Sequence, residues 1–512
     1  MKAFFSGRTG TNRHSVEVLK YISLTIKMNG MKVLSIEAST SSARAMIYDS
    51  EKGVLRTKSA AYGSKIDRGG IMNINGVCDL VFTLAREITA DEKDIEAVGI
   101  CGTWHNMCVF NRENHPVTDL YSWNYTGYGK IWDLVRKDKT LTDEFYTRTG
   151  CMPHTTYSRT AIKYLKDNGL VLEDKKFATF GGYCFRLLTG KLYESRCSLS
   201  GAGLINLESE NYDDFVLDYL GIKHNQLGTL VSNDDVLPLS EKGAELLGLK
   251  SGIPVVPAHA DGAMNMVAVK GNRPGVITMS VGTSGAMRMI SQKPAVPVNH
   301  SLWCYVGVNS FVSGAATNGA CNCINRFREE NNVPYSLLEE GFNPRRDYPV
   351  FLPFIFGERC PGWNDERRDG FVQDVSSFSV SERFQAIEMG ILFNLYQSLS
   401  SLEKANGKIS EIILAGGITN SVHWVKMACD IFDSDIYVSR CPDASTIGAA
   451  ALALHAAGAL DDVNCFSGEY DKLEKVKKNP ENHGFFMNHY QRYLEAYEQS
   501  SFAKSGTLQS AL

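Results

Sequence analysis

Short strand-like runs on either side of small polar loops predict two β-hairpins that share one pattern. Residues 32–37 form a strand-like run, residues 38–42 a small polar loop, and residues 45–49 a returning strand. Much later in the chain, residues 276–281, 282–285 and 286–290 repeat strand, loop and strand. Aligning Thr40-Ser41 with Thr283-Ser284 brings the two copies into register. This match indicates an internal duplication, with a chance resemblance between two hairpins as the alternative.

Apolar residues at helical spacing fill the intervals between strands. They predict helices over residues 74–90, 161–168, 381–405 and 422–432, while β-branched runs at 97–100 and 411–414 predict buried strands. Strands that alternate with helices are typical of α/β layers. The turn composition of residues 270–275 predicts a domain boundary. Residues 472–478 form a charged run that we expect to be solvated, and residues 488–500 predict a terminal amphipathic helix.

Composition narrows the class of protein. A chain of 512 residues that is 44% hydrophobic can bury a large core, so disorder throughout the chain is excluded. The length indicates two to four domains, or two if each is large. The net charge of −4 gives no basic excess that would favour nucleic acid or an anionic membrane as a partner. No apolar run is as long as a membrane span, and residues 447–460 predict a buried helix instead.

The cysteines and residues 1–30 give information on the cellular compartment of the protein. The thirteen cysteines are irregularly spaced, and Cys321-Asn322-Cys323 lacks the second pair of a zinc knuckle. We therefore expect free thiols in a reducing cytoplasm. Residues 1–30 lack the apolar stretch and cleavage site of a signal peptide. They predict a poorly ordered extension, with a transit peptide as the alternative.

Four loops have the composition of phosphate- or nucleotide-binding loops. They span residues 39–42, 282–285, 314–320 and 415–421. Small residues let backbone N–H groups approach phosphate oxygens, and glycine permits the tight backbone that this requires. Each loop alone is more typical of an ordinary turn. Four such strand-to-loop junctions in one α/β chain favour nucleotide binding, although none matches the Walker pattern or a dinucleotide fingerprint.

A few side chains could carry chemistry. Asp261 follows a predicted strand at 254–257 and precedes a helix, so it is either a helix N-cap or a general base beside a phosphate site. Glu37 ends the first strand within an apolar run, where a metal with its water shell or an ion pair with Arg or Lys would compensate its charge. Trp104 and His105 lie in a loop after a strand, where a lone histidine is also typical of a structural role.

Together these segments resemble the FGGY family of carbohydrate kinases, members of the actin-like ATPase superfamily. The likeness runs in order over residues 31–460. The family's opening phosphate motif is similar to residues 37–44, its Gly-Gly-x-Asp segment to residues 259–262, and its Gly-Thr-Ser to residues 282–284. Its Leu-Pro-x-x-x-Gly-Glu-Arg-x-Pro motif is intact at residues 352–361, with Trp363 following as in the gluconate-kinase-like branch. The adenosine motif resembles Gly416-Gly417 through Ser421.

The resemblance implies an α/β fold of two actin-like (ribonuclease H-like) domains with a ligand cleft between them. Residues 31–272 would form the sugar-binding domain, residues 273–462 the ATP-binding domain, and residues 463–512 a helical tail. The implied reaction is ATP-dependent phosphorylation of a hydroxyl on a small sugar, polyol or sugar acid, with Mg²⁺ and with closure of the cleft over ATP.

The resemblance also assigns roles to individual residues. Asp261 would be the catalytic base, and Glu37 and Asp261 would lie near Mg²⁺. Substrate would contact Trp104, His105 and Trp123 in addition to Asp261. Thr40 and Ser41 would face the γ-phosphate of ATP, and Gly282 and Thr283 would face its other phosphates. The adenosine would contact Gly416, Gly417 and Ser421. Two further ATP-binding residues would be Arg44 and Gly319.

Several positions depart from the family's pattern. Glu37 stands where the acid is usually Asp, and Ser39 stands where Gly is usual. The family's Trp-x-Asp-x-Arg stretch reads Trp123-Asn124-Tyr125-Thr126-Gly127, so the usual sugar-gripping Asp and Arg are missing. We therefore predict a rebuilt specificity pocket, with a pentulose such as xylulose as the alternative to gluconate. A catalytically weak sugar or nucleotide sensor and an actin-like ATPase without a sugar substrate are further alternatives. Whether the chain forms a homodimer is left open.

Overall fold

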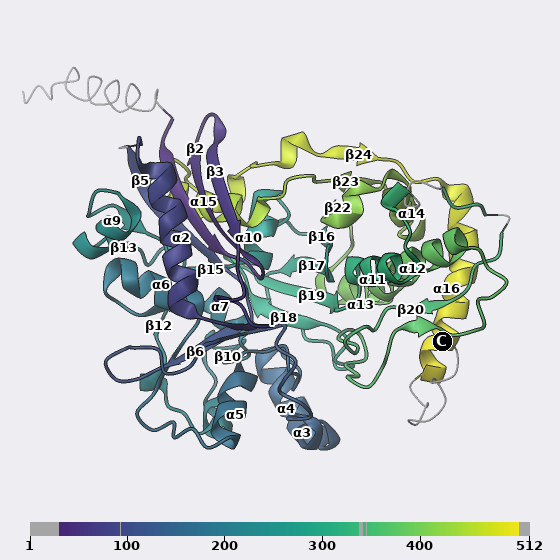
Figure 1. Cartoon of the computed structure of the whole chain (residues 1–512), viewed down its shortest axis with the longest axis horizontal. Coiled ribbons are helices and arrows are strands. Elements are labelled where there is room, and N and C mark those ends of the chain that lie inside the picture. Colours follow the sequence, from purple (N-terminus) through teal and green to yellow (C-terminus); the bar gives the residue numbers. More distant parts are fainter. Residues whose placement is uncertain (1–29, 93, 337–340, 345, 501–512) are drawn as a thin grey trace, which may run out of the picture.

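The computed structural model describes residues 30–92, 94–336, 341–344 and 346–500. The predicted extension, apart from Gly30, and residues 501–512 of the predicted tail lie outside this part. The described chain forms two α/β halves that lie side by side (Figure 1). None of its helices in the described ranges is both long and apolar enough to cross a membrane. The cysteines carry free thiols.

The N-terminal half is built on one mixed sheet. Its strand order is β13-β14-β5-β1-β2-β3, with β15 also pairing with β5. The predicted hairpin is β1 and β2, which pair antiparallel, and β5 runs parallel to β1. The strands are β1 (Lys32–Ala38), β2 (Ser42–Asp49), β3 (Gly53–Ala61), β5 (Ile95–Gly102), β13 (Leu237–Pro238), β14 (Pro254–Val255) and β15 (His259–Ala260).

Both faces of this sheet are covered. Leu34 and Ile36 of β1 pack into one apolar cluster with the helices α2 (Ile74–Thr89), α6 (Phe180–Thr189) and α9 (Glu241–Leu247). Val33, whose side chain points to the opposite face, packs into a second cluster that continues into the other half. A central strand that is buried on both sides carries apolar side chains on both faces, as Val33, Leu34 and Ile36 do here.

The C-terminal half repeats the topology of the first. Its strand order is β18-β19-β17-β16-β22-β23-β24. The pair β16 and β17 takes the place of β1 and β2, and β22 runs parallel to β16 as β5 does to β1. The strands are β16 (Val276–Val281), β17 (Gly285–Ser291), β18 (Trp303–Val306), β19 (Phe311–Thr317), β22 (Glu411–Ala415), β23 (Ile436–Val438) and β24 (Glu474–Val476). The shared strand order confirms the internal duplication.

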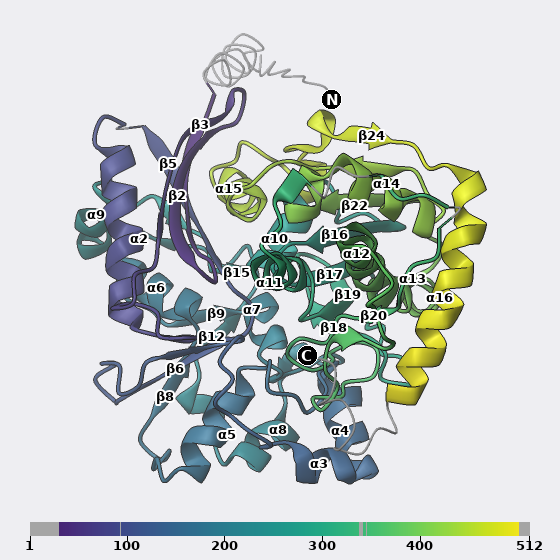
Figure 2. The ribbon, with the colours of Figure 1, turned by 45° about the vertical axis from the view of Figure 1, so that its right-hand side comes forward.

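Helices α10 (Asp261–Ala268) and α15 (Ala444–Ala456) pack on each other between the two sheets (Figure 2). Although α15 comes late in the chain, it lies against β1 and β5 of the N-terminal sheet. The approach is close: a Cβ on Gly99 of β5 would meet the backbone of Ala449, and one on Gly448 would meet the backbone of Met264. The predicted buried helix at 447–460 is thus the element that joins the halves.

The C-terminal sheet is flanked by helices of its own half. They are α11 (Cys321–Asn331), α12 (Val380–Tyr396), α13 (Leu399–Asn406), α14 (Val422–Ile431) and α16 (Pro480–Ser500). Figure 2 shows α16 along the outer edge of this half. The short strands β20 (Phe351–Leu352) and β21 (Gly370–Phe371) form a separate ribbon.

An insertion between β5 and β14 forms the lower part of the N-terminal half in Figure 1. Several helices and a small sheet of order β4-β7-β6-β8 build this part, and the sheet takes strand β4 from the chain before β5. The strands are β4 (Ile71–Met72), β6 (Asn106–Phe110), β7 (Leu120–Ser122) and β8 (Lys176–Ala178), and the helices are α3 (Asp133–Lys137), α4 (Lys139–Thr149), α5 (Arg159–Asp167), α7 (Arg196–Gly201) and α8 (Asp214–Leu220). Smaller pairs are β9 (Tyr193–Ser195) with β12 (Thr229–Val231) and β10 (Ile205–Asn206) with β11 (Asn211–Tyr212).

Three predicted elements differ in the structure. Residues 381–405 form two helices, because Ser398 N–H donates to Leu395 O, three residues back, and so interrupts the regular ladder. Residues 314–317 belong to strand β19 rather than to a loop, and Gly314 is required there because a Cβ would meet Trp303. The tail is not all helical: Glu474–Val476 form edge strand β24, in which Lys475 pairs with Asp435.

Candidate active site

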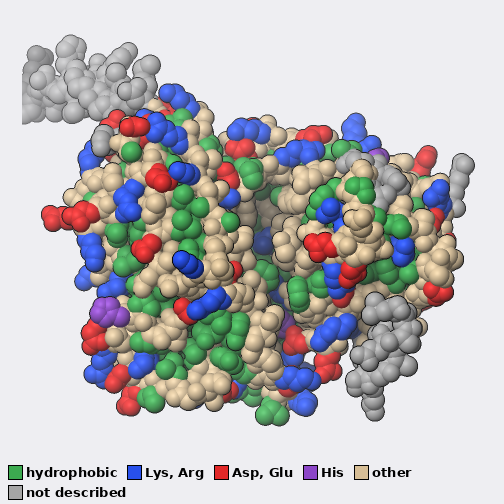
Figure 3. Space-filling model, viewed as in Figure 1, with side chains coloured by type: hydrophobic (Ala, Val, Ile, Leu, Met, Phe, Trp, Pro, Cys, Tyr) green, Lys and Arg blue, Asp and Glu red, His purple; other side chains and the backbone are tan. Residues whose placement is uncertain are grey.

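A cleft of about 2280 Å³ lies between the two halves. The tip of the β1–β2 hairpin lines it with Thr40 and Ser41, and the tip of the β16–β17 hairpin lines it with Gly282 and Thr283. Trp123 and Gly416 also line it. Figure 3 shows the molecule hollowed between its halves, with basic side chains in the depth of the hollow. The duplication therefore points the two predicted phosphate loops into one space from opposite sides.

Asp261 lies at the start of α10 but does not cap it. The N-cap position is Ala260, and Asp261 is the first helical residue. Its Oδ1 accepts hydrogen bonds from the backbone N–H of Gly262 at 2.8 Å and of Trp104 at 3.3 Å. Its Oδ2 has no hydrogen-bond partner among the described residues, and the side chain is partly exposed. The N-cap alternative is thus wrong, and one carboxylate oxygen stays available.

The surroundings of Asp261 place its pKa near neutrality. Burial raises the pKa of Asp261 to about 6, and the negative charge of Glu37 adds to this, while the charge of Arg288 and the two N–H donors oppose it. A carboxyl group with such a pKa is ionised at pH 7 yet basic enough to take a proton. Asp261 is not among the side chains that line the cleft; it lies beside them, since Arg288 interacts with Asp261 and donates to Ser280 Oγ, a lining atom, at 3.2 Å.

Trp104 and His105 are buried next to Asp261, with 6% and 8% of their surface exposed. Burial lowers the pKa of His105 to about 3, and the charge of Arg359 acts in the same direction, so the ring is neutral at pH 7. His105 Nδ1 bonds the carbonyl of Gly201, which makes Nδ1 the protonated nitrogen and leaves Nε2 as an acceptor. The Trp104 indole is fixed by a 2.9 Å hydrogen bond to Cys197 O.

Glu37 forms part of a buried network that joins the two halves. Its Oε2 accepts from Arg44 Nη1 at 3.0 Å and from the hydroxyl of Thr446, and its Oε1 accepts from the hydroxyl of Ser445. Arg44 Nε also contacts Asp443 Oδ1 at 3.0 Å. Ser445 and Thr446 lie in the first turn of α15. Of the two alternatives for Glu37, the structure therefore shows the ion pair. The side chain is one methylene longer than that of Asp, and this extra length extends its carboxylate toward α15.

A metal at Glu37 does not fit this arrangement. Both oxygens are engaged, and a divalent cation there would lie beside the Arg44 guanidinium. Among the described residues, no three His, Cys, Asp or Glu side chains are grouped as metal ligands. The sequence-based assignment of Glu37 to Mg²⁺ thus finds no support. Arg44, which the sequence assigned to ATP, already pairs with two carboxylates, those of Glu37 and Asp443. Asp261 Oδ2 is a carboxylate oxygen near the cleft that has no hydrogen-bond partner among the described residues.

The predicted adenosine loop joins β22 to α14. Gly416 has φ +96°, a conformation that favours glycine, and lines the cleft. Gly417 begins a short 3₁₀ turn and is exposed. Ser421 is buried and caps α14 by accepting from Trp424 N at 3.2 Å. Gly319 is needed for packing, because a Cβ there would meet the backbone of Pro353.

Trp123 and the altered sugar stretch lie at the N-terminal side of the cleft. Trp123 Nε1 donates to Thr40 Oγ1 at 3.0 Å, which ties the predicted sugar residue to the predicted phosphate loop. The ring of Tyr125 packs edge-on against Tyr128 with centroids 4.8 Å apart. A Cβ on Gly127 would meet the Tyr125 ring, so the two departures from the family pattern depend on each other.

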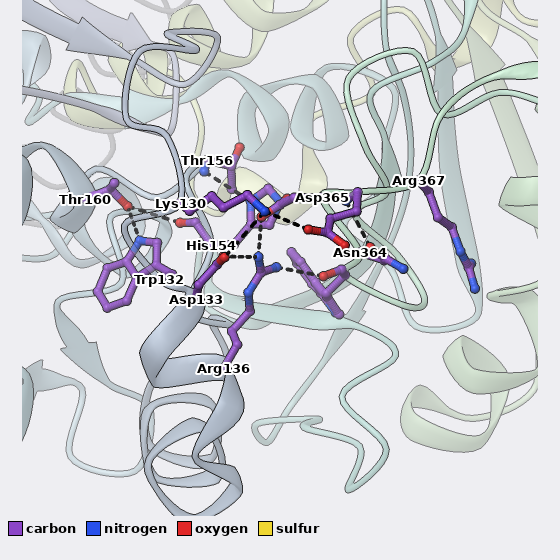
Figure 4. A network of polar contacts seen from close by, with 12 residues as sticks. Lys130, Trp132, Asp133, Arg136, His154, Thr156, Thr160, Asn364, Asp365 and Arg367 are labelled. Atoms are coloured by element: carbon purple, nitrogen blue, oxygen red, sulfur yellow. Dashed lines mark hydrogen bonds and ion pairs between the residues drawn. The ribbon is translucent and has the colours of Figure 1, made fainter. Parts of the chain in front are cut away.

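A polar network crosses the cleft from α3 and the segment after α4 to the loop between β20 and β21 (Figure 4). His154 Nε2 lies 2.8 Å from Asp365 Oδ1, and Arg136 contacts Asp365 Oδ2 and donates to Trp363 O at 2.8 Å. Burial alone would raise the pKa of Asp365, but the hydrogen bond from His154 and the charge of Arg136 outweigh it and lower the pKa to about 2. Lys130 Nζ adds an ion pair with Glu366 at 2.7 Å.

Comparison with known proteins agrees with this geometry. The model described as the N-terminal domain of the FGGY family of carbohydrate kinases matches residues 32–268, and the model of its C-terminal domain matches residues 277–457. The chain belongs to the FGGY family of carbohydrate kinases. It is a sugar kinase with the two-domain, actin-like architecture of that family, in which ATP is the expected phosphate donor.

Individual relatives of this FGGY kinase differ in their substrates. It is 25% identical to a gluconokinase from Bacillus subtilis over 459 residues, covering 85% of this chain and 89% of the relative. The solved xylulose kinase from Lactobacillus acidophilus matches with a TM-score of 0.85 at 22% identity, covering 92% of this chain and 99% of that chain. The gluconate kinase from the same species gives a TM-score of 0.82 at 22% identity, covering 93% and 99%.

Sequence reasoning missed two residues of this FGGY kinase that act on its site. Arg288 lies on β17, where a charged residue interrupts the apolar run of residues 286–290, and that interruption was a readable signal. Arg359 belongs to the intact motif at 352–361 but received no role. The His154–Asp365 contact had no sequence signal, because the two residues are remote in the chain.

Proposed function

We propose that this FGGY kinase transfers the γ-phosphate of ATP to a hydroxyl group of a small sugar, polyol or sugar acid, with Asp261 as the general base. The observation that carries the proposal is the state of the Asp261 carboxyl group. Its Oδ1 is fixed by two backbone N–H groups, its Oδ2 has no partner in the described part of the chain, and its pKa is about 6. Oδ2 would take the hydroxyl proton while the hydroxyl oxygen bonds to the γ-phosphorus and the bond to ADP breaks.

The two hairpin tips support the placement of ATP. Thr40 and Ser41 face Gly282 and Thr283 across the cleft, so hydroxyl and backbone N–H donors from both halves would surround the phosphates. Gly416 and Gly417 would lie against the adenosine, and Ser421 and Gly319 would shape their loops rather than touch the nucleotide. Mg²⁺ would be held by phosphate oxygens and water, with Asp261 as the nearby carboxylate.

The network around Asp365 supports closure of the cleft. Arg136 and Lys130 bring positive charge from the N-terminal half to the loop of the other half. His154, whose pKa is lowered by burial, adds a 2.8 Å contact to Asp365. Such contacts would hold the halves together while water is excluded from the reacting phosphate. The free thiols support the expected reducing cytoplasm.

The test is release of ADP from ATP in the presence of a panel of aldonates, polyols, aldoses and ketoses. The proposal requires ADP release that depends on an acceptor, and a phosphorylated acceptor as product. Tight binding of sugar or nucleotide without turnover by any acceptor would instead favour the sensor alternative.

A further inference from the structure

Two neighbouring arginines, the partly exposed Arg288 beside Asp261 and the buried Arg359, lack the carboxylate ion pair that buried cations usually have. Arg359 is 7% exposed, and no side-chain hydrogen bond of Arg359 is found within the described part of the chain. Arg288 donates from Nη1 to Ser280 Oγ, but its buried Nε is unpartnered. No ion pair of the described residues includes either arginine. In the same half, the charge of the buried Arg367 is compensated in the usual way, by a 2.8 Å ion pair with Glu358.

The groups around Arg359 do not compensate its charge. It acts electrostatically on His105, Tyr157 and Tyr305, which are neutral at pH 7 because burial lowers the pKa of the histidine and raises the pKa of both tyrosines. Its charged neighbour Arg288 repels it. Arg288 lies next to the catalytic helix, since a Cβ on Gly262 would be 2.9 Å from Arg288 Nε. Arg288 thus has one adjacent carboxylate, Asp261, and its neighbour Arg359 brings a second positive charge to the same place.

Burying an unpaired charge is costly, so such a pair is typical of a site whose counter-charge arrives with a ligand. A guanidinium presents a planar fork of N–H donors that matches a carboxylate in two parallel hydrogen bonds. Beside Arg359, the neutral ring of His105 offers Nε2 as an acceptor for a hydroxyl group. The combination fits a ligand with one carboxylate and several hydroxyls.

We propose that the acceptor is a sugar acid, an aldonate, whose carboxylate is held by Arg288 and Arg359 while one of its hydroxyls lies at Asp261. This inference rests on the proposed function and names its substrate class. The neutral pentulose is thereby disfavoured, and the pair of arginines takes over the role that the missing family Arg near Trp123 would have had. Arg288 lies outside the motifs that carry the family resemblance, so it is the residue that makes this pocket select an acid.

The γ-phosphate of ATP is the other anion that could meet these arginines. The carboxylate is favoured because Arg359 lies among His105, Tyr157 and Tyr305, whereas the predicted phosphate loops line the cleft at Thr40 and Gly282. The two sources make different kinetic predictions. Loss of a carboxylate contact raises the KM for the acceptor, and loss of a phosphate contact raises the KM for ATP or lowers kcat with every acceptor.

The experiment compares gluconate with glucitol, which has the same carbon chain but no carboxylate. ADP release is measured at pH 8, where Asp261 is ionised even after a neighbouring charge is removed. Wild-type protein should prefer gluconate. Arg288→Met and Arg359→Met should each lower kcat/KM for gluconate on the order of 10- to 100-fold, mainly through KM, and change glucitol much less. Arg56→Gln, an exposed and distant β3 residue that pairs with Glu92, is the matched control.

Binding gives a second measurement that does not need turnover. Gluconate and glucitol are titrated into Asp261→Asn, where loss of the negative charge should leave gluconate binding intact or tighter. Arg288→Lys keeps a charge and should recover part of the affinity that Arg288→Met loses, which separates this role from misfolding.

Efficient phosphorylation of glucitol or xylulose with no preference for gluconate would overturn the inference and leave the proposed function standing. A rise in the KM for ATP alone would also overturn it. Failure of every acceptor to release ADP would overturn the proposed function, and the binding titration would then decide the inference by itself.

Discussion

Replacing Asp261 by Asn isolates the chemical role of one proton acceptor. Asn keeps an Oδ1 that can accept from Gly262 and Trp104 N–H, so the start of α10 should be unchanged. The amide cannot take the hydroxyl proton. Loss of a general base typically costs 10²–10⁴-fold, which corresponds to about 3–5 kcal/mol of transition-state stabilisation. We expect kcat to fall by that factor while the affinity for ATP stays nearly the same.

The pH dependence of kcat/KM in the wild-type protein gives a second, independent test of Asp261 as the base. With the pKa of Asp261 at about 6, the carboxylate is the main form at pH 7 and the minor form at pH 5. The base must be ionised, so kcat/KM should rise with pH through about 6 and fall roughly tenfold per pH unit below it. In Asp261→Asn this acidic limb should be absent from the residual activity.

The assay is ADP release under saturating ATP, with ATP affinity measured separately by titration. Asp214→Asn is a matched control, because Asp214 is likewise the first residue of a helix, α8, but is exposed and pairs only with His224. It should retain wild-type kcat. An Asp261→Asn protein that keeps more than about a tenth of kcat would refute the assignment of the base.

Three further changes test other parts of the site. Gly417→Val should raise the KM for ATP with little effect on the acceptor KM, and the reverse pattern would mean that this loop faces the acceptor. Glu37→Gln should lower the free energy of unfolding, measured in urea, by about 3 kcal/mol, because Arg44 loses a buried partner. The control Glu87→Gln, which breaks an exposed ion pair, should lower it by less than about 1 kcal/mol. Equal losses in the two variants would contradict the role of the Glu37 network. Asp365→Asn should cost about 1–2 kcal/mol at pH 7 after allowance for solvent screening. Because the pKa of Asp365 is lowered, that stabilisation is complete above 3.8 and lost as the pH falls toward 2, so a difference between the two proteins that persists at pH 2 would contradict it.

The altered sugar stretch has a clearer physical meaning in the structure than in the sequence. Tyr125 packs into a cluster of tyrosines and fills the space that a side chain at residue 127 would need. Restoring the family residues therefore requires both changes together, Tyr125→Asp with Gly127→Arg. We expect the pair to shift the ratio of kcat/KM values toward neutral sugars, and an unchanged ratio would place both positions outside the pocket.

The sequence alone determined the local elements and the residues at their ends. Strand runs around Thr40 and Thr283 were readable because side chains alternate across a sheet, and the likeness of the two hairpins anticipated the repeated strand order. Asp261 was found because it lies between a strand and a helix. Such signals are local, since they depend on periodicity and turn composition within a few residues.

Only the tertiary structure decided which distant groups meet. Glu37 is satisfied by Ser445, 408 residues away, because α15 crosses to the N-terminal sheet. Asp261 acquires its pKa from burial and from Arg288, which is carried by the other half. The uncompensated charge of Arg359 likewise depends on which rings surround it. Burial and partner choice follow from how the two halves pack, and no pattern along the chain encodes the distance between two side chains on different halves.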